Sequence, residues 1–279
     1  MPPLPTSIDR YQVLKRLGSG QMGVLYLGRD PEIGRLVAIK VLRDDVHDEQ
    51  IRERFRREAT IGRLIHQNII MVFDVGEHEG QPFITMEYID GAIVSQLIEE
   101  RLAMPLELRL RLVEQLCSGL HYAHGFGIYH RDIKPENLMV DRRRTLKILD
   151  FGVAHIDVAG SKSEMTQAGD LMGTFNYMSP EQVVGHKTDF RCDIFAVGAV
   201  MYELLSFQKA FPGSLHDGLL QRVLRDPPVP LDQLVPDIDP VLVTIVNKAL
   251  EKDREQRYQD LAAMEADVAR VRVSASFLS

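Results

Sequence analysis

A change in hydrophobic periodicity near residues 88–91 limits what this 279-residue chain can fold into more than any other feature of its sequence. Before it, the apolar runs are short and rich in β-branched and aromatic residues: YQVLKRL, VLYLGR, LVAIKVL, IIMVFDV and PFITMEY. Turn-forming pairs such as Asp30-Pro31 and Glu79-Gly80 separate these runs, which predicts antiparallel strands. One charged segment, about residues 48–65, carries a narrow apolar stripe and is predicted as a helix.

After Gly91 the pattern is mainly helical. Apolar residues recur at helical spacing from Leu106 to Leu120, which predicts a long helix with a buried face. Short strands are predicted at 138–140 and 145–149, and further helices at about 189–205, 240–250 and 259–271. The sequence therefore predicts an α+β fold of two lobes: a small β-rich lobe with one helix (about 11–88), a hinge (about 87–91) and a larger, mainly helical lobe (about 92–271).

Composition excludes several classes of protein. The formal net charge is −7, from 33 basic and 40 acidic residues, which argues against a general nucleic-acid binder but not against a nucleotide ligand. The two cysteines, Cys117 and Cys192, are far apart in sequence, so we expect buried thiols rather than a disulfide framework or a zinc site. The N-terminus lacks the pattern of a signal peptide, and no apolar run approaches the roughly 20 residues that span a bilayer.

Three glycines, Gly18, Gly20 and Gly23, lie between two predicted strands. Glycine lets the backbone approach phosphate oxygens closely and adopt unusual φ values. A dinucleotide-binding fold requires a helix after the glycines, whereas here a strand follows. The P-loop pattern GxxxxGK[ST] is absent as well. The glycines therefore favour a phosphate-binding turn between two strands.

The strand Val37-Ala38-Ile39-Lys40 carries a candidate phosphate ligand. Alternation along a strand places Ala38 and Lys40 on one face and the two branched residues on the other. A small residue beside a lysine leaves room for a base and directs an ammonium group toward phosphates. Such a lysine needs a carboxylate partner, because an unpaired buried charge is costly.

The run His130-Arg131-Asp132-Ile133-Lys134-Pro135-Glu136-Asn137 supplies the groups that phosphoryl transfer to a hydroxyl requires. Asp132 can accept the hydroxyl proton, and Lys134 can neutralise the transferred phosphoryl group. Asn137 offers an amide oxygen to a metal ion. Asp150, which begins Asp150-Phe151-Gly152, adds the hard anionic oxygen that magnesium prefers.

Together these segments resemble the protein kinase superfamily over about residues 11–271. The segments DRYQVLKRLGSGQMGVLY and HRDIKPENLMV most resemble those of bacterial serine/threonine kinases of the eukaryotic type. The resemblance implies ATP and Mg²⁺ as cofactors, with Mn²⁺ as an alternative, and serine or threonine hydroxyls of proteins as acceptors. It pairs Glu58 with Lys40. It also implies that the Thr174 hydroxyl bridges Asp132 and Lys134, a combination typical of kinases that act on serine and threonine.

The resemblance further implies a set of nucleotide-contacting residues, drawn from the glycine loop, the lysine strand, the hinge and the pocket floor: Leu17, Gly18, Ser19, Gly20, Gln21, Met22, Gly23, Val24, Leu25, Ala38, Lys40, Met86, Glu87, Ile89 and Met139. Leu25 stands where such kinases usually have valine, which keeps an apolar cover for a base. Ile93 stands where many have a carboxylate near the ribose, so the ribose contact is left unassigned.

Regulation and scaffolding follow from the same resemblance. Arg131 precedes the expected base, and a cation there invites a phosphate from the activation segment, the stretch from Asp150 to Glu181. Its candidate acceptors are Thr166, Ser163 and Ser161, and the spacing to Gly173-Thr174 favours Thr166. The resemblance also implies two structural features. Glu181 is expected to form an ion pair with Arg257, and Asp193 is expected to brace the catalytic loop.

Two other functions are considered as alternatives to an active protein kinase. A pseudokinase or scaffold module would typically lack Lys40, Asp132 or Asp150, and all three are present. A small-molecule phosphotransferase of related fold should lack the segment Ser179-Pro180-Glu181. His121 and His124 have a spacing that can bind metal, but with no third ligand evident we expect packing or partial exposure.

We expect a cytoplasmic chain without membrane or nucleic-acid contact. A homodimer is compatible with the sequence. Bacterial kinases of this type often continue into a regulatory or membrane-anchored region, so anchoring of a longer parent protein through a region after Ser279 is compatible with this location.

Overall fold

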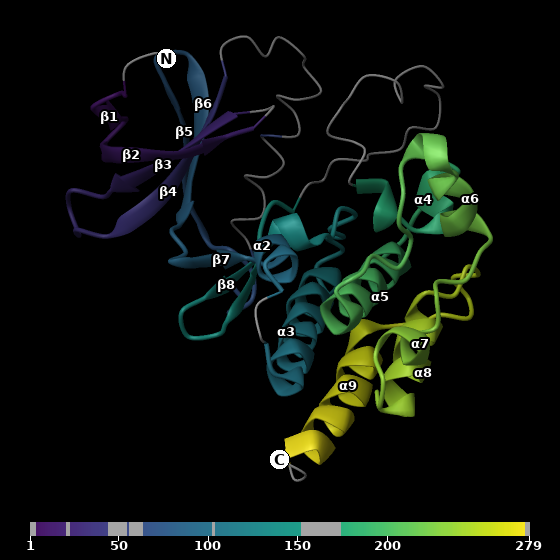
Figure 1. Cartoon of the computed structure of the whole chain (residues 1–279). Coiled ribbons are helices and arrows are strands. Elements are labelled where there is room, and N and C mark those ends of the chain that lie inside the picture. Colours follow the sequence, from purple (N-terminus) through teal and green to yellow (C-terminus); the bar gives the residue numbers. More distant parts are fainter. Residues whose placement is uncertain are drawn as a thin grey trace. The chain divides into compact units, whose positions relative to one another are not determined.

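The computed structural model describes residues 4–20, 23–43, 55, 64–101, 104–151 and 174–276. These divide into two compact units, Met1–Asp90 and Gly91–Ser279 (Figure 1). The division falls within the segment predicted as a hinge. The N-terminal unit contains a curled β-sheet, and the C-terminal unit is mainly helical, as the change in periodicity predicts.

The N-terminal unit contains a six-stranded antiparallel sheet in the order β1-β2-β3-β4-β6-β5. Its strands are β1 (Ser7–Ile8), β2 (Tyr11–Ser19), β3 (Gly23–Arg29), β4 (Leu36–Leu42), β5 (Val72–His78) and β6 (Gln81–Glu87). The strand predicted at 69–75 corresponds to β5, which begins at Val72. Ile69 and Ile70 are buried ahead of the strand, and a buried apolar run does not by itself mark where pairing starts.

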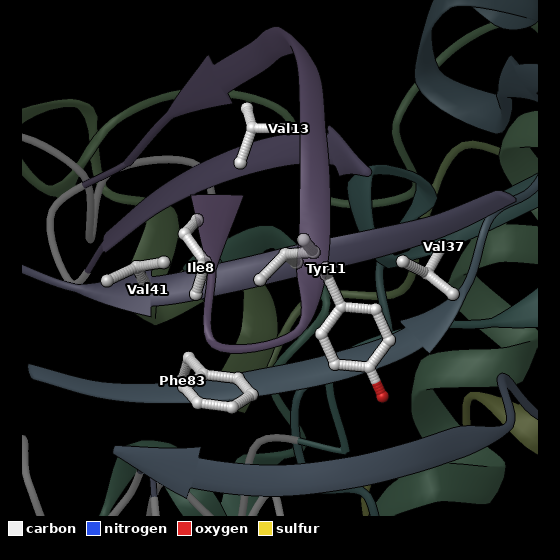
Figure 2. Packing of buried hydrophobic residues seen from close by; sticks show 7 residues of the cluster. Ile8, Tyr11, Val13, Val37, Val41 and Phe83 are labelled. Atoms are coloured by element: carbon white, nitrogen blue, oxygen red, sulfur yellow. The ribbon is translucent and has the colours of Figure 1, made fainter. Parts of the chain in front are cut away.

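One face of this sheet packs into a hydrophobic cluster. Figure 2 shows its members Ile8, Tyr11, Val13, Val37, Val41 and Phe83, and Ile39 completes it. The ring of Tyr11 meets that of Phe83 edge-on, with 6.5 Å between centroids. The alternate residues of β4 that enter the cluster are those that the sequence pattern turns away from Lys40. The opposite face of β4 is therefore left for Ala38 and Lys40.

The C-terminal unit contains a short three-stranded sheet and a set of helices. The sheet has the order β7-β8-β9, formed by β7 (Gly91–Ile93), β8 (Leu138–Asp141) and β9 (Leu146–Ile148). The helices are α2 (Val94–Glu99), α3 (Leu106–His124), α4 (Pro180–Val183), α5 (Arg191–Ser206), α6 (Leu219–Leu224), α7 (Leu231–Leu234), α8 (Pro240–Ala249) and α9 (Leu261–Ser276). The 3₁₀ turns are η2 (Pro135–Asn137), η3 (Thr174–Asn176) and η4 (Leu215–Asp217).

The α5 helix forms the centre of this unit. Every residue from Cys192 to Leu205 is buried, as expected of a helix that is hydrophobic on all sides. It packs against α3 and α8, and α9 lies along α3 (Figure 1). A side chain at Gly198 would collide with Ala249 of α8, so glycine permits the close approach of these two helices. A core helix of this kind offers a rigid base for the loops beside it.

Four helices were not predicted from the sequence: α2, α4, α6 and α7. Each spans only four to six residues, which is too short for hydrophobic periodicity to be detected. No helix within the described residues is both long and apolar enough to cross a membrane.

Candidate active site

The glycine turn joins β2 and β3. Gly18 pairs with Leu25 across the two strands, and the Gly20 N–H donates to the Gly23 carbonyl at 2.9 Å. A Cβ on Gly23 would collide with the carbonyl of Val41, so this glycine is required by the sheet itself. At Gly18 and Gly20 an added Cβ meets none of the described atoms within 4 Å. The described part of the protein therefore does not itself require glycine at these two positions.

Strand register brings several predicted nucleotide contacts onto one face. Directly opposite residues of an antiparallel pair point to the same side. Ala38 lies opposite Met86, and Lys40 lies opposite Leu25, so these four share the face away from the cluster of Figure 2. Val24 lies opposite Val41 on the core face, so its backbone alone can face a nucleotide.

The remaining predicted members of this set are placed less directly. Leu17 and Ser19 are exposed on β2, and Glu87 ends β6. Ile89 follows that strand and is buried. Met139 belongs to the C-terminal unit, where it pairs with Ile93 of β7 and with Lys147 of β9. Gln21, Met22 and Glu58 lie outside the described residues.

Asp132, in the loop between α3 and η2, has two carboxylate oxygens in different surroundings. Oδ2 lies 3.1 Å from the Lys134 ammonium and accepts a 3.1 Å bond from Asn137 Nδ2. Oδ1 is buried and accepts no hydrogen bond from any residue that the structure describes. Buried polar atoms normally have a partner. The arrangement therefore holds one oxygen in place and leaves the other without a hydrogen bond from the described residues.

His130 connects this loop to the segment that leads into Asp150. Its Nε2 donates to the Leu149 carbonyl at 2.9 Å, and its Nδ1 accepts from the Asp132 N–H at 3.3 Å. A carbonyl only accepts and a backbone N–H only donates, so these bonds assign the neutral tautomer with the proton on Nε2. The ring also packs against Phe151, with 4.7 Å between centroids.

Asn137 and Asp150 supply the oxygen ligands that a magnesium ion would take. The Asn137 Nδ2 donates to the Asp132 carbonyl at 2.7 Å, so its Oδ1 is directed elsewhere. The Leu149 N–H donates to the Asn137 carbonyl at 2.8 Å, which holds the residue before Asp150 beside Asn137. An amide oxygen and a carboxylate are hard donors, and this chemistry fits Mg²⁺.

Asp193 of α5 binds the backbone of the catalytic loop, residues 130–137. Its Oδ1 accepts from the Arg131 N–H at 2.7 Å, and its Oδ2 accepts from the His130 N–H at 2.9 Å and lies 2.8 Å from His124 Nε2. Burial by itself raises the pKa of this carboxyl, but the His124 ring and the backbone N–H groups outweigh burial and hold the pKa below its usual range. These bonds hold Arg131 at a positive φ of 62°.

The expected pair between Glu181 and Arg257 is present and is bidentate, with N–O distances of 2.7 and 2.8 Å. Arg257 is 2% exposed. Each of its five N–H groups has an acceptor, since the other three donate to the carbonyls of Glu251, Arg191 and Lys252. Although burial opposes it, this pairing lowers the pKa of Glu181.

The residues after Thr174 are anchored in the helical core. Asn176 Nδ2 donates to the Phe211 carbonyl at 2.6 Å, and the Tyr177 hydroxyl donates to Glu203 of α5 at 2.5 Å. Burial raises the pKa of Glu203 and that of Tyr177. The Thr174 side chain, and the candidate phosphosites Ser161, Ser163 and Thr166, lie outside the described residues, so their predicted roles stay predictions.

Sequence reasoning missed the role of His124. Packing or partial exposure was expected of it, and the ring does pack against Phe190, but its contact with Asp193 was not predicted. No periodic signal distinguishes a histidine at the end of α3 that faces α5 from one that faces solvent. Cys117 and Cys192 are both buried and free, as expected, and burial raises the pKa of each thiol.

Comparison with known proteins connects this geometry to a family. A family model described as the protein kinase domain matches residues 11–268. The chain is 39% identical over 273 residues to serine/threonine-protein kinase PknB of Mycobacterium leprae, covering 96% of this chain and 44% of that protein. It is 37% identical over 264 residues to probable serine/threonine-protein kinase PknB of Lactococcus lactis (94% and 42%) and 37% over 265 residues to probable serine/threonine-protein kinase SCO3848 of Streptomyces coelicolor (93% and 39%). The chain spans less than half the length of these curated relatives.

Proposed function

The chain belongs to the protein kinase domain family, and from this premise we propose that it transfers the γ-phosphoryl group of ATP to serine and threonine hydroxyls of proteins. The relatives named above are serine/threonine-protein kinases of bacteria, which supports the same acceptor class here. Lys134, together with Thr174, follows the pattern of family members that act on these hydroxyls.

The observation that carries the proposal is the state of the Asp132 carboxylate. Oδ2 is held by Lys134 and Asn137, while the buried Oδ1 accepts no bond within the described part of the chain. An acceptor hydroxyl that donates to Oδ1 would be aligned for attack, and Asp132 would take its proton. Lys134 lies next to this carboxylate and would offset negative charge on the transferring group.

The nucleotide and its metal would be held by the residues that the family pattern assigns. Lys40, on the face of β4 away from the cluster of Figure 2, would contact phosphates, with Glu58 as its partner. Asn137 and Asp150 would hold Mg²⁺, or Mn²⁺ in its place, and the metal would offset charge on the phosphates. Ala38, Leu25 and Met86 on the same face as Lys40 would cover the adenine, and the backbone of Glu87 and Ile89 would pair with its edge.

Transfer from labelled ATP to a generic protein substrate tests the activity. The wild-type chain should transfer label in a Mg²⁺-dependent way. Asp132→Asn keeps the size of the side chain but removes the base, so the rate should fall by about 10²- to 10⁴-fold. Circular dichroism of both proteins provides the control for folding. Absence of transfer by a folded wild-type chain would instead favour a pseudokinase.

A small-molecule phosphotransferase is the other alternative, and substrate choice distinguishes it. The anchored segment Asn176-Tyr177-Met178-Ser179-Pro180, which leads into Glu181, supports a peptide acceptor. Label should therefore appear on protein serine or threonine rather than on small alcohols or amines added at the same concentration.

Control by phosphorylation of the activation segment is part of the proposal. Arg131 lies directly before Asp132, and its backbone N–H donates to Asp193. A phosphate on Thr166, or on Ser163 or Ser161, would have a cationic partner in Arg131. After incubation with ATP, mass spectrometry should find phosphate on Thr166. Unchanged activity of Thr166→Ala would place the control elsewhere.

A further inference from the structure

Gln182, the third residue of α4, uses both ends of its side-chain amide. Its Oε1 accepts from the Ser179 N–H at 3.0 Å and lies 3.1 Å from the Ser179 hydroxyl. Its Nε2 donates to the Arg131 carbonyl at 2.8 Å. The first contact is a capping-box interaction, in which a Gln or Glu side chain reaches back to the residue that begins the helix. The second leaves the helix and reaches the catalytic loop.

The partners determine which atom of the amide lies where. The Ser179 N–H can only donate, so an oxygen must face it, and the Arg131 carbonyl can only accept, so a nitrogen must face it. Glutamine meets both demands. Glutamate has the same length and can still accept from Ser179, but it has no donor for Arg131. Methionine has a similar length and lacks both functions.

The bond to Arg131 acts on the peptide unit that directly precedes the catalytic base. This unit runs from the Arg131 carbonyl to the Asp132 N–H. Gln182 binds its oxygen, and His130 Nδ1 accepts from its nitrogen at 3.3 Å. Arg131 has a φ of 62°, a region that residues other than glycine enter at a cost unless their surroundings hold them. Rotation about the Cα–C bond of Arg131 would turn this plane and move the Asp132 Cα and with it the carboxylate.

Gln182 is itself held by the core. The preceding residue, Glu181, forms the buried bidentate pair with Arg257. Because α4 is only four residues long, this pair restricts the position of the whole helix. A displacement of α4 would therefore be transmitted through one side chain to the peptide before Asp132.

We infer that Gln182 is a positioning residue that orients Asp132 by holding the Arg131–Asp132 peptide plane. This inference deepens the proposed function and rests on it. It also connects the end of the activation segment with the base, independently of the Asp193 contacts that approach the loop from α5.

Three variants of phosphatase-treated protein test the inference: Gln182→Glu, Gln182→Met and Gln233→Glu. Gln233 is exposed on α7, far along the chain from the loop, and serves as the control for adding one negative charge. Steady-state kinetics give kcat and KM for ATP and for a serine peptide. Thermal unfolding reports on stability, and amide hydrogen exchange by NMR reports on the Asp132 N–H.

Both Gln182 variants should lower kcat by on the order of 10- to 100-fold, as misplacement of a reacting group does, with KM for ATP unchanged. The melting temperature should stay near that of the wild type. The Asp132 amide should exchange several-fold faster in both variants, while the amides of His130 and Arg131, which bind Asp193, keep their protection. Gln233→Glu should resemble the wild type in every measurement.

Two results would overturn the inference: an unchanged kcat in Gln182→Met, or a loss of kcat that follows a loss of folded protein or a rise in KM for ATP. If the wild type itself transfers no phosphate, the proposed function fails, and the exchange measurement still decides the positioning role. In that case, unchanged exchange at Asp132 in both variants contradicts it and faster exchange supports it.

Discussion

The contacts around Asp132 come from residues of two kinds, those near it in sequence and those far along the chain. One oxygen is bound by neighbours that are close in sequence, Lys134 and Asn137. The groups that orient the residue as a whole come from further away, through Asp193 and Gln182. Lys134, Asn137 and Asp193 were recognisable from motifs that resemble the family, whereas Gln182 was not.

A residue-scale prediction concerns Arg257. Removing one partner of a buried ion pair leaves the other charge uncompensated, so Arg257→Ala should lower the free energy of unfolding by about 3–5 kcal/mol. The partner Glu181 is buried, and the Arg257 side chain has no exposed area. Denaturation in urea measures the change.

Arg254→Ala is the matched control for this variant. Arg254 lies three residues earlier, is 38% exposed and reaches Asp189 only at 3.5 Å. Exposed ion pairs contribute about 0–1 kcal/mol, so its loss should be small. Equal effects of the two substitutions would contradict the role assigned to the buried pair.

At the scale of elements, α5 carries two buried carboxylates whose pKa values shift in opposite directions. Asp193 faces the catalytic loop and accepts N–H bonds that lower its pKa. Near the other end of the same helix, Glu203 has its pKa raised by burial. One helix therefore braces the loop at its start and anchors Tyr177 near its end.

These shifts predict pH dependences of opposite sign. Asp193 stabilises the folded state above its unfolded pKa of about 4, and this stabilisation is lost as the pH falls through its lowered folded value. Relative to Asp193→Asn, the wild type should therefore gain stability as the pH rises from about 3 to 5. Chemical denaturation at a series of pH values measures the difference between the two proteins.

Glu203→Gln provides the opposite case. A raised folded pKa contributes stability below the unfolded value of about 4.3, and this contribution disappears as the pH rises through the folded value. The wild type should thus lose stability relative to Glu203→Gln as the pH rises above about 4.3. Parallel curves for the wild type and either variant would show that the carboxylate concerned does not titrate as assigned.

At the scale of the whole molecule, the proposed reaction draws on residues from both compact units. Lys40 belongs to the N-terminal unit, whereas Asn137 and Asp150 belong to the C-terminal unit. A ligand that binds the folded protein stabilises it, by about 2.7 kcal/mol at one hundred times its Kd. Nucleotide binding should therefore be visible in the thermal stability of the chain.

We expect ATP with Mg²⁺ to raise the melting temperature of the wild-type chain by several degrees and EDTA to remove most of this rise. Lys40→Met in one unit and Asp150→Asn in the other should each reduce the rise, measured against the same variant without ligand. A full rise in either variant would contradict its assignment to the nucleotide or the metal. Differential scanning fluorimetry is sufficient for all of these measurements.

Sequence patterns alone predict the α+β architecture, the strands that carry the glycines and Lys40, and the long helices α3, α5, α8 and α9. Periodicity and short motifs report local preferences, and these elements are long enough, or their motifs dense enough, to be recognised. The family resemblance added the pair between Glu181 and Arg257, which lie 76 residues apart. Element boundaries and the shortest helices were not predictable, because their ends depend on packing.

Two further residues that contact Asp193 and the catalytic loop could be identified only once the fold was known. His124 and Gln182 carry no motif of their own, and their roles come from partners 69 and 51 residues away in the chain. A side-chain amide or imidazole bonds to whatever donor or acceptor the fold brings within about 3 Å. The sequence names these residues but not their neighbours, and the neighbours determine what they do.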